Sequence, residues 1–141
     1  MNRLLYEKSV SYKGHLIIPF IFSRIGCETI YSYKLLAQDY TSPLHQSENL
    51  SGICTNNLDD ILKLAKQNLD EKINSYLGID PFRDRYIYQN HLIILHYQNG
   101  KYFYDHYRPE ELTNIAAPKL FISENDCLSW IKHGLDQHKV G

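Results

Sequence analysis

Three of the seven histidines lie in one short stretch of the chain, residues 85–107, where their spacing could support chemistry. His91, His96 and His106 are accompanied there by Asp105 and by several tyrosines. Imidazole changes its charge near neutral pH, so it suits proton transfer and metal ligation better than any other side chain. What this stretch can do depends on which of these side chains share a face.

A tight hairpin is predicted to position these side chains. Asn99-Gly100 separates two runs rich in Ile, Leu, Tyr and Phe, which is typical of a two-residue turn between antiparallel strands. Closing the hairpin there pairs Gln98 with Lys101 and determines every later pair. One face, the Tyr/His face, then carries His91, Ile93, Leu95, Tyr97, Tyr102, Tyr104 and His106. The opposite face carries Leu92, Ile94, His96, Phe103, Asp105 and Tyr107.

Two candidate sites follow from this register. His91 and His106 are diagonal neighbours with Cβ atoms roughly 7 Å apart, so beside Tyr104 they could share a metal or a substrate proton. His96 and Asp105 could form the orienting pair of a general base. No Asp or Glu has a recognisable spacing for a third metal ligand. Hydrogen bonding of these histidines to backbone or water is the favoured interpretation, so no catalytic residue and no metal ligand is assigned.

The cysteines and glycines form none of the familiar motifs. Cys27, Cys54 and Cys127 are widely spaced and contain no C-x-x-C pair, so neither a zinc knuckle nor a redox motif is predicted. We expect three free thiols, with buried structural positions favoured over a catalytic thiol. The seven glycines are isolated, and none forms a phosphate-binding loop. No cofactor is predicted.

Two amphipathic helices are predicted. Residues 56–77 carry apolar side chains at the three-and-four spacing of one buried stripe, with Asn57 as the N-cap and Gly78 after the last turn. A final helix follows Ser123–Asp126, which resembles a capping box, and runs to about Gln137. The other expected elements are strands at 4–12, 15–23, 28–37 and 118–122, a short helix at 109–115, and a polar connector at 38–55.

These elements predict a single α+β domain over residues 1–141. It has a mainly antiparallel sheet of five to six strands, with the two principal amphipathic helices packed on one face. The segments 12–18 (YKGHLII) and 88–94 (YQNHLII) match at five positions. An internal β-β-β-α duplication, with half-repeats 1–78 and 79–141, would explain this match. Convergent strand composition explains it equally well.

Composition narrows the classes of partner. The formal net charge of −1 argues against nucleic acid, because phosphate binding needs a basic excess. The longest apolar run, residues 16–22, is far shorter than the roughly twenty residues of a membrane span. No signal peptide is recognised at the start of the sequence. The chain is therefore expected to be cytoplasmic, without a membrane or nucleic-acid partner.

Twelve tyrosines suit a sheet surface, since tyrosine joins a large apolar body to a polar tip. We expect the helices to leave the Tyr/His face uncovered. The predicted function is a non-catalytic protein-interaction or regulatory module that binds another protein or a second copy of the chain. The alternative is a small hydrolase or transferase with a His/Tyr/Asp acid–base or metal site on the 85–107 hairpin. The expected contact residues are His91, Tyr97, Tyr102, Tyr104 and His106.

Overall fold

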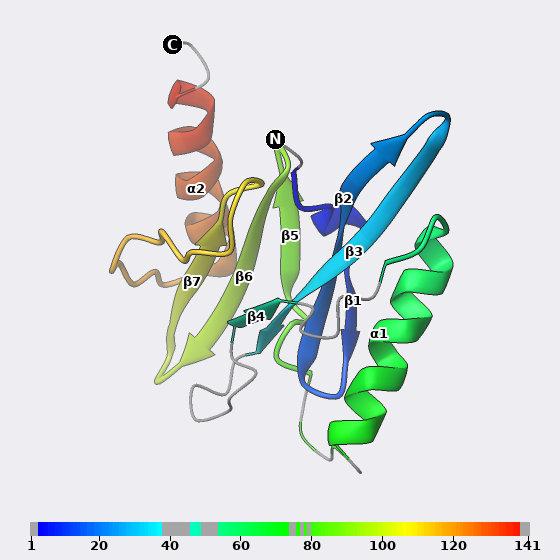
Figure 1. Cartoon of the computed structure of the whole chain (residues 1–141). Coiled ribbons are helices and arrows are strands. Elements are labelled where there is room, and N and C mark those ends of the chain that lie inside the picture. Colours follow the sequence, from blue (N-terminus) through cyan, green and yellow to red (C-terminus); the bar gives the residue numbers. More distant parts are fainter. Residues whose placement is uncertain are drawn as a thin grey trace. The chain divides into compact units, whose positions relative to one another are not determined.

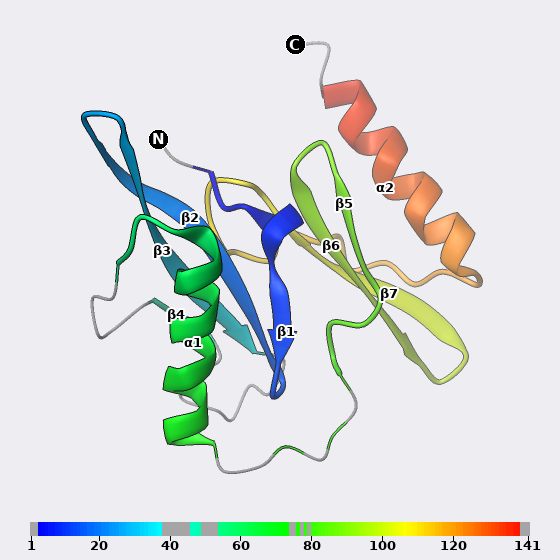
Figure 2. The same ribbon diagram turned by 90° about the vertical axis from the view of Figure 1, so that its right-hand side faces the viewer.

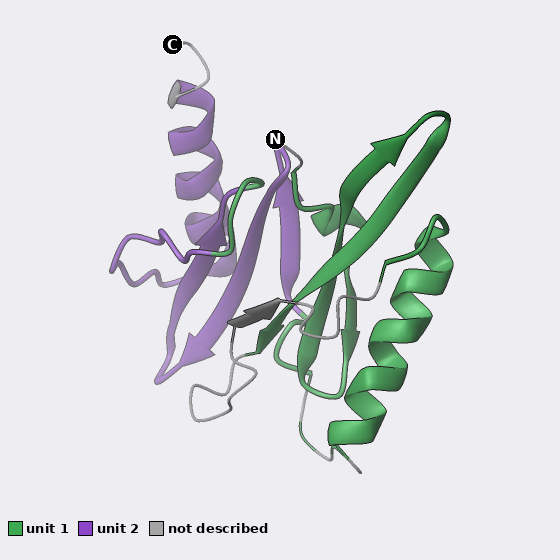
Figure 3. Ribbon diagram, in the orientation of Figure 1, with its two compact units in different colours: residues 1–83, 109–112 green, residues 84–108, 113–141 purple. Residues whose placement is uncertain are grey.

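The computed structural model describes residues 3–37, 46–48, 54–73, 76, 78 and 80–138. The chain divides into two compact units, which Figure 3 colours separately. Unit 1 contains residues 1–83 and 109–112, and unit 2 contains residues 84–108 and 113–141. Each unit combines antiparallel strands with an α-helix, so the α+β class predicted from the sequence is confirmed.

Unit 1 is an antiparallel sheet with a helix packed along it (Figures 1 and 2). The sheet order is β1-β2-β3-β4, formed by Val10–Tyr12, His15–Ile25, Glu28–Ala37 and Gln46–Glu48. A 3₁₀ turn at Tyr6–Lys8 precedes β1, and helix α1, Leu58–Lys72, follows β4. The apolar stripe of α1 packs on β2 and β3. The buried core between them contains Ile17, Tyr33, Leu35, Ile61, Ala65 and Leu69.

Unit 2 repeats this pattern with three strands. The sheet order is β5-β6-β7, formed by Arg85–Tyr88, His91–Gln98 and Lys101–Tyr107. Helix α2, Glu124–His138, ends the described part of this unit and packs on the sheet. The buried core contains Ile93, Leu95, Tyr104, Phe121, Cys127 and Ile131.

Two-residue turns close the hairpins of both units. Asn99 and Gly100 both have positive φ, 55° and 76°, as the predicted primed turn requires. The turn at residues 13–14 has the same character, with φ values of 48° and 79°. A third such turn, at Gln89-Asn90, divides the predicted first strand of the 85–107 hairpin into β5 and β6. This turn is not predicted from the sequence, because neither of its residues is a glycine.

The prediction of one sheet with five to six strands is wrong. Among the described residues, the ladders join β1 to β4 in one sheet and β5 to β7 in another, and each sheet carries its own helix. Four of the five strand pairs are closed by a two-residue turn and are therefore local. Hydrophobic patterning specifies such local pairs, but it does not specify which hairpin joins which sheet.

The helix predicted at residues 109–115 is absent. The Asn114 side-chain oxygen accepts backbone N–H bonds from His106 at 2.9 Å and from Ala116 at 3.0 Å. The N–H of Ile115 donates to the His106 carbonyl at 2.8 Å. These bonds hold the segment as an extended bridge beside β7. Asparagine favours such local bonds to the backbone over a helical ladder.

Other element boundaries also differ from the predicted ones. Residues 6–8 form the 3₁₀ turn, so the first strand is shorter than the predicted range 4–12. Helix α1 ends at Lys72, because Ile73 already has extended backbone with φ −127° and ψ 109°. The predicted connector 38–55 lies mostly outside the described residues.

Both helices begin at the predicted N-caps. The Asn57 side chain accepts the N–H of Asp60, and the Ser123 hydroxyl accepts the N–H of Asp126, each at 3.1 Å. Asn57→Ala and Ser123→Ala should each lower the free energy of unfolding by about 1 kcal/mol, measured by urea denaturation. Asn125→Ala, at an exposed first-turn position, is the control and should cost much less. Equal losses in all three variants would contradict the capping assignment.

Candidate functional site

The β6–β7 hairpin has the predicted register. Gln98 pairs with Lys101 across the turn, and pairing continues without a slip to Leu92 opposite Tyr107. The Tyr/His face and the opposite face therefore contain the residues predicted for them.

Helix α2 covers part of the Tyr/His face, so the expectation that the helices leave this face open is wrong there. Tyr104 and His106 keep only 5% and 9% of their surface exposed, because the apolar stripe of α2 packs on this end of the sheet. Tyr97 lies at the other end, is 63% exposed, and has its ring centroid 4.7 Å from that of Tyr102. The predicted contact residues are thus divided between a recessed histidine end and an exposed tyrosine end.

His91 and His106 meet at the recessed end. The Nδ1 atom of His91 lies 2.9 Å from the Nε2 atom of His106, and the ring centroids are 5.0 Å apart. The Tyr104 ring lies 6.4 Å from that of His106. The predicted convergence of two imidazoles beside Tyr104 is confirmed as geometry. The role of these residues as a contact surface stays a prediction.

A half-open cavity of about 570 Å³ lies at the histidine end of unit 2. Its volume falls within the range of roughly 300–1,000 Å³ that is common for small-molecule sites. Side chains from the sheet, from α2 and from residues 115–117 line it. The polar lining consists of Gln89, His91, His106 and Arg108. The remaining lining residues are Tyr104, Ile115, Ala117, Trp130, Ile131, Gly134 and Leu135.

The His106 ring is neutral in the folded protein at pH 7. Burial, together with the nearby charges of His91 and Arg108, lowers the pKa of His106 to about 4. Neutral imidazole keeps one donor and one acceptor nitrogen, so His106 contributes polar atoms without charge. Arg108 supplies positive charge, and the described lining contains no Asp or Glu. The cavity is therefore suited to an anion.

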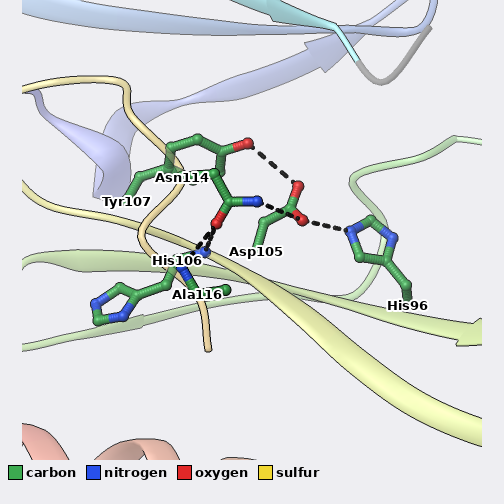
Figure 4. Close-up of polar contacts among 6 residues, drawn as sticks. All are labelled: His96, Asp105, His106, Tyr107, Asn114 and Ala116. Atoms are coloured by element: carbon green, nitrogen blue, oxygen red, sulfur yellow. Dashed lines mark hydrogen bonds and ion pairs between the residues drawn. The ribbon is translucent and has the colours of Figure 1, made fainter. Parts of the chain in front are cut away.

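The opposite face contains the predicted pair of His96 and Asp105, 3.3 Å apart between Nε2 and Oδ1. Figure 4 shows the Asp105 carboxylate held also by Asn114 and Tyr107, with the His106 ring directed away from it. The Asn114 amide and the Tyr107 hydroxyl each donate to this carboxylate at 3.1 Å. Because Asp105 is only 5% exposed and ties Asn114 to β7, its contacts hold the fold together.

The sequence does not single out four of the lining residues, which are Gln89, Arg108, Trp130 and Gly134. Trp130 and Gly134 lie four residues apart on α2 and so share a helical face. That spacing is the one signal in the sequence that could place these two residues at a common site. Gln89 lies in a turn and Arg108 follows a strand, where no periodic pattern marks them.

The cysteines are free as predicted, but only Cys127 is buried. Its burial, with the charge of Glu124, raises the pKa of the thiol to about 11, so it is protonated and unreactive at neutral pH. Cys27 and Cys54 are exposed, which contradicts the expectation of buried positions for them. Among the described residues, no three His, Cys, Asp or Glu side chains are grouped as metal ligands.

The low pKa of His106 predicts a loss of stability in acid. As the pH falls from about 6.5 toward 4, the unfolded chain takes up the His106 proton before the folded chain does, so the folded state becomes less stable. From pH 7 to pH 5 this group should remove about 1 kcal/mol, after allowance for solvent at the cavity mouth. His106→Gln should show a correspondingly smaller decrease in urea denaturation. The exposed control His133→Gln should behave like the wild type, and an unchanged decrease in His106→Gln would contradict the assignment.

Comparison with protein-family models, with curated proteins and with solved structures finds no match to this chain.

Proposed function

We propose that this chain is a non-catalytic binding module that acts through the Tyr/His face of β5-β6-β7. The observation that carries the proposal is the cavity of about 570 Å³ where this face meets α2. Its two imidazoles bond to each other, and the pKa of His106, near 4, makes this side chain a weak base at neutral pH. Such a site is better suited to holding a ligand than to removing a proton.

The alternative, a small hydrolase or transferase on the 85–107 hairpin, has less support. The contact between His91 and His106 would allow a proton to pass between them. An effective general base, however, has a pKa near the working pH. The second pair, His96 and Asp105, lies on the other face, where the carboxylate is already bonded to Asn114 and Tyr107.

Exposed apolar side chains in unit 2 support a protein partner or self-association. Tyr97 is 63% exposed, and large apolar side chains that stay exposed are common at interaction surfaces. No helix in the described part of the chain is long and apolar enough to cross a membrane. We further propose that the chain works in the cytoplasm, without nucleic acid. The other exposed apolar side chains of unit 2 are Ile87, Ile115, Leu120, Ile122 and Trp130.

Self-association is tested by size-exclusion chromatography with light scattering. We expect the wild-type protein to have the mass of two chains, and Tyr97→Ser to shift it toward one chain by removing exposed aromatic surface. Ile25→Ser removes an apolar side chain of similar exposure, 66%, from unit 1 and should leave the mass unchanged. A wild type that is monomeric at every concentration, and that binds no other protein, would contradict the proposed interaction role.

We also propose that the chain arose by internal β-β-β-α duplication, with half-repeats 1–78 and 79–141. The matching segments 12–18 and 88–94 occupy the same place in each unit, across the β1–β2 and β5–β6 turns. Within them, Tyr12 pairs with His15 as Tyr88 pairs with His91. Convergent strand composition alone would not place the two segments at the same strand pairs in both units.

The agreement continues outside the matching segments. Before α1, Tyr31 and Thr55 exchange both backbone hydrogen bonds. Before α2, Tyr102 and Phe121 do the same, and Phe121 is the residue of the predicted strand 118–122 that forms this bridge. Each bridge lies two residues before the cap of a helix of 15 residues. The supporting pairs therefore span all parts of the β-β-β-α unit.

Contacts between sheet and helix also agree. The Tyr12 hydroxyl donates to Asp70 at 2.7 Å, and Lys66 lies over its ring at 5.5 Å from the centroid. The Tyr88 hydroxyl donates to Asp136 at 2.7 Å, and Lys132 lies over its ring at 5.4 Å. In both units the Lys and Asp are four residues apart on the helix. The same arrangement at corresponding places is what a common origin predicts.

An experimental structure tests the duplication. Superposition of β1-β2-β3-α1 on β5-β6-β7-α2 should align Tyr12 with Tyr88, Tyr31 with Tyr102, and Asn57 with Ser123 at the same time. The physical reason is that a common ancestor has one strand register and one helix phase. A best superposition shifted by one residue on any strand would contradict the proposal, since such a shift exchanges the faces.

A further inference from the structure

The two units differ at the place where unit 2 has its cavity. Asn68 of α1 and Gly134 of α2 each lie eleven residues after the helix N-cap. The Asn68 amide donates to the Tyr33 hydroxyl at 2.9 Å, which joins helix and sheet in unit 1. Tyr104 takes the place of Tyr33 in unit 2, because each lies two residues after the bridged tyrosine of its strand.

Glycine at position 134 leaves this space open. A Cβ atom built on Gly134 would meet no atom within 4 Å, and the residue lines the cavity. The Tyr104 hydroxyl instead accepts the N–H of Ala117 at 3.0 Å, so its own proton can be donated to a ligand. The cavity therefore occupies the place where unit 1 has a side chain.

The lining of the cavity combines aromatic rings with positive charge. The Trp130 and Tyr104 rings lie 6.2 Å apart between centroids, and Trp130 is 43% exposed. Planar ligands gain stacking contacts on such rings. Arg108 brings a guanidinium, whose paired N–H groups match the two oxygens of a carboxylate. Neither Asp nor Glu occurs among the described lining residues to oppose an anion.

We propose that this cavity binds a small planar ring compound that carries one carboxylate. Its ring lies against the exposed part of Trp130, near the Tyr104 hydroxyl, and its carboxylate lies beside Arg108. The proposal rests on the proposed binding function, because the cavity lies at the histidine end of the Tyr/His face. It adds the chemical class of the ligand, and it explains why α2 has a glycine at position 134.

Trp130 is the single tryptophan of the chain and lines the cavity, so its fluorescence responds to a ligand bound there. The probe is phenylacetate, with phenylacetamide as the uncharged analogue and acetate as the analogue without a ring. Phenylacetate should change Trp130 emission in a saturable way. Both analogues should bind about tenfold more weakly or worse, since each lacks one of the two recognised groups. No saturable response to phenylacetate, or equal affinity for the acid and the amide, would overturn the proposal.

Two variants separate the roles of the lining residues. Gly134→Asn places in α2 the residue that unit 1 has at this point, and it should abolish the phenylacetate response. Ser129→Asn adds the same side chain at an exposed position of α2 and should retain the response. Arg108→Gln should retain ring binding but lose the preference for phenylacetate over phenylacetamide. A full response in Gly134→Asn, or an unchanged preference in Arg108→Gln, would contradict the assigned geometry.

Thermal unfolding shows whether a lost response has a structural cause. Asparagine is a better helix former than glycine, so Gly134→Asn should melt at or above the wild-type temperature. If phenylacetate fails to bind while Tyr97→Ser disrupts self-association, the ligand proposal fails and the interaction role stands. If phenylacetate binds to a protein that is monomeric and captures no partner, the interaction role fails and the ligand site stands.

Discussion

Strand register in the β6–β7 hairpin is the constraint on which the rest of unit 2 depends. The positive φ values of Asn99 and Gly100 close the turn after Gln98, and all pairs toward His91 follow from it. A slip of one residue would exchange the two faces of the sheet. His91 and His106 would then lie on the face away from α2. Helix α2 would meet the polar carboxylate of Asp105 instead of an apolar surface.

On the surface that this register creates, α2 fits closely at the core and leaves a gap at one point. Cys127 and Ile131 fill the space against the sheet, whereas Gly134 leaves it empty. In unit 1, Asn68 bridges the helix to Tyr33 at the corresponding place. In unit 1 a side-chain hydrogen bond therefore closes the space between helix and sheet, whereas unit 2 has a cavity there beside its imidazoles. We propose that this place serves structure in unit 1 and ligand binding in unit 2.

Local signals in the sequence predicted the hairpin register, the helix caps and the α+β class, because each depends on residues close together in the chain. The division into two sheets was missed, since patterning does not order hairpins. The helix predicted at residues 109–115 does not form, because the Asn114 side chain bonds to the backbone and to Asp105. Of the candidate site, the meeting of His91 and His106 followed from register alone. The cavity did not, because it depends on how α2 docks and on the absence of one side chain at Gly134.

We propose that His106 is a neutral member of the binding cavity and does not act as a base. The most direct test is a pH titration of the histidine rings by ¹⁵N nuclear magnetic resonance on the folded protein. We expect the His106 ring to stay neutral as the pH falls from 7 to 5 and to take up its proton near pH 4. A His106 ring that titrates near its ordinary value of 6.5 would rule out this neutral role and would favour acid–base chemistry at this site.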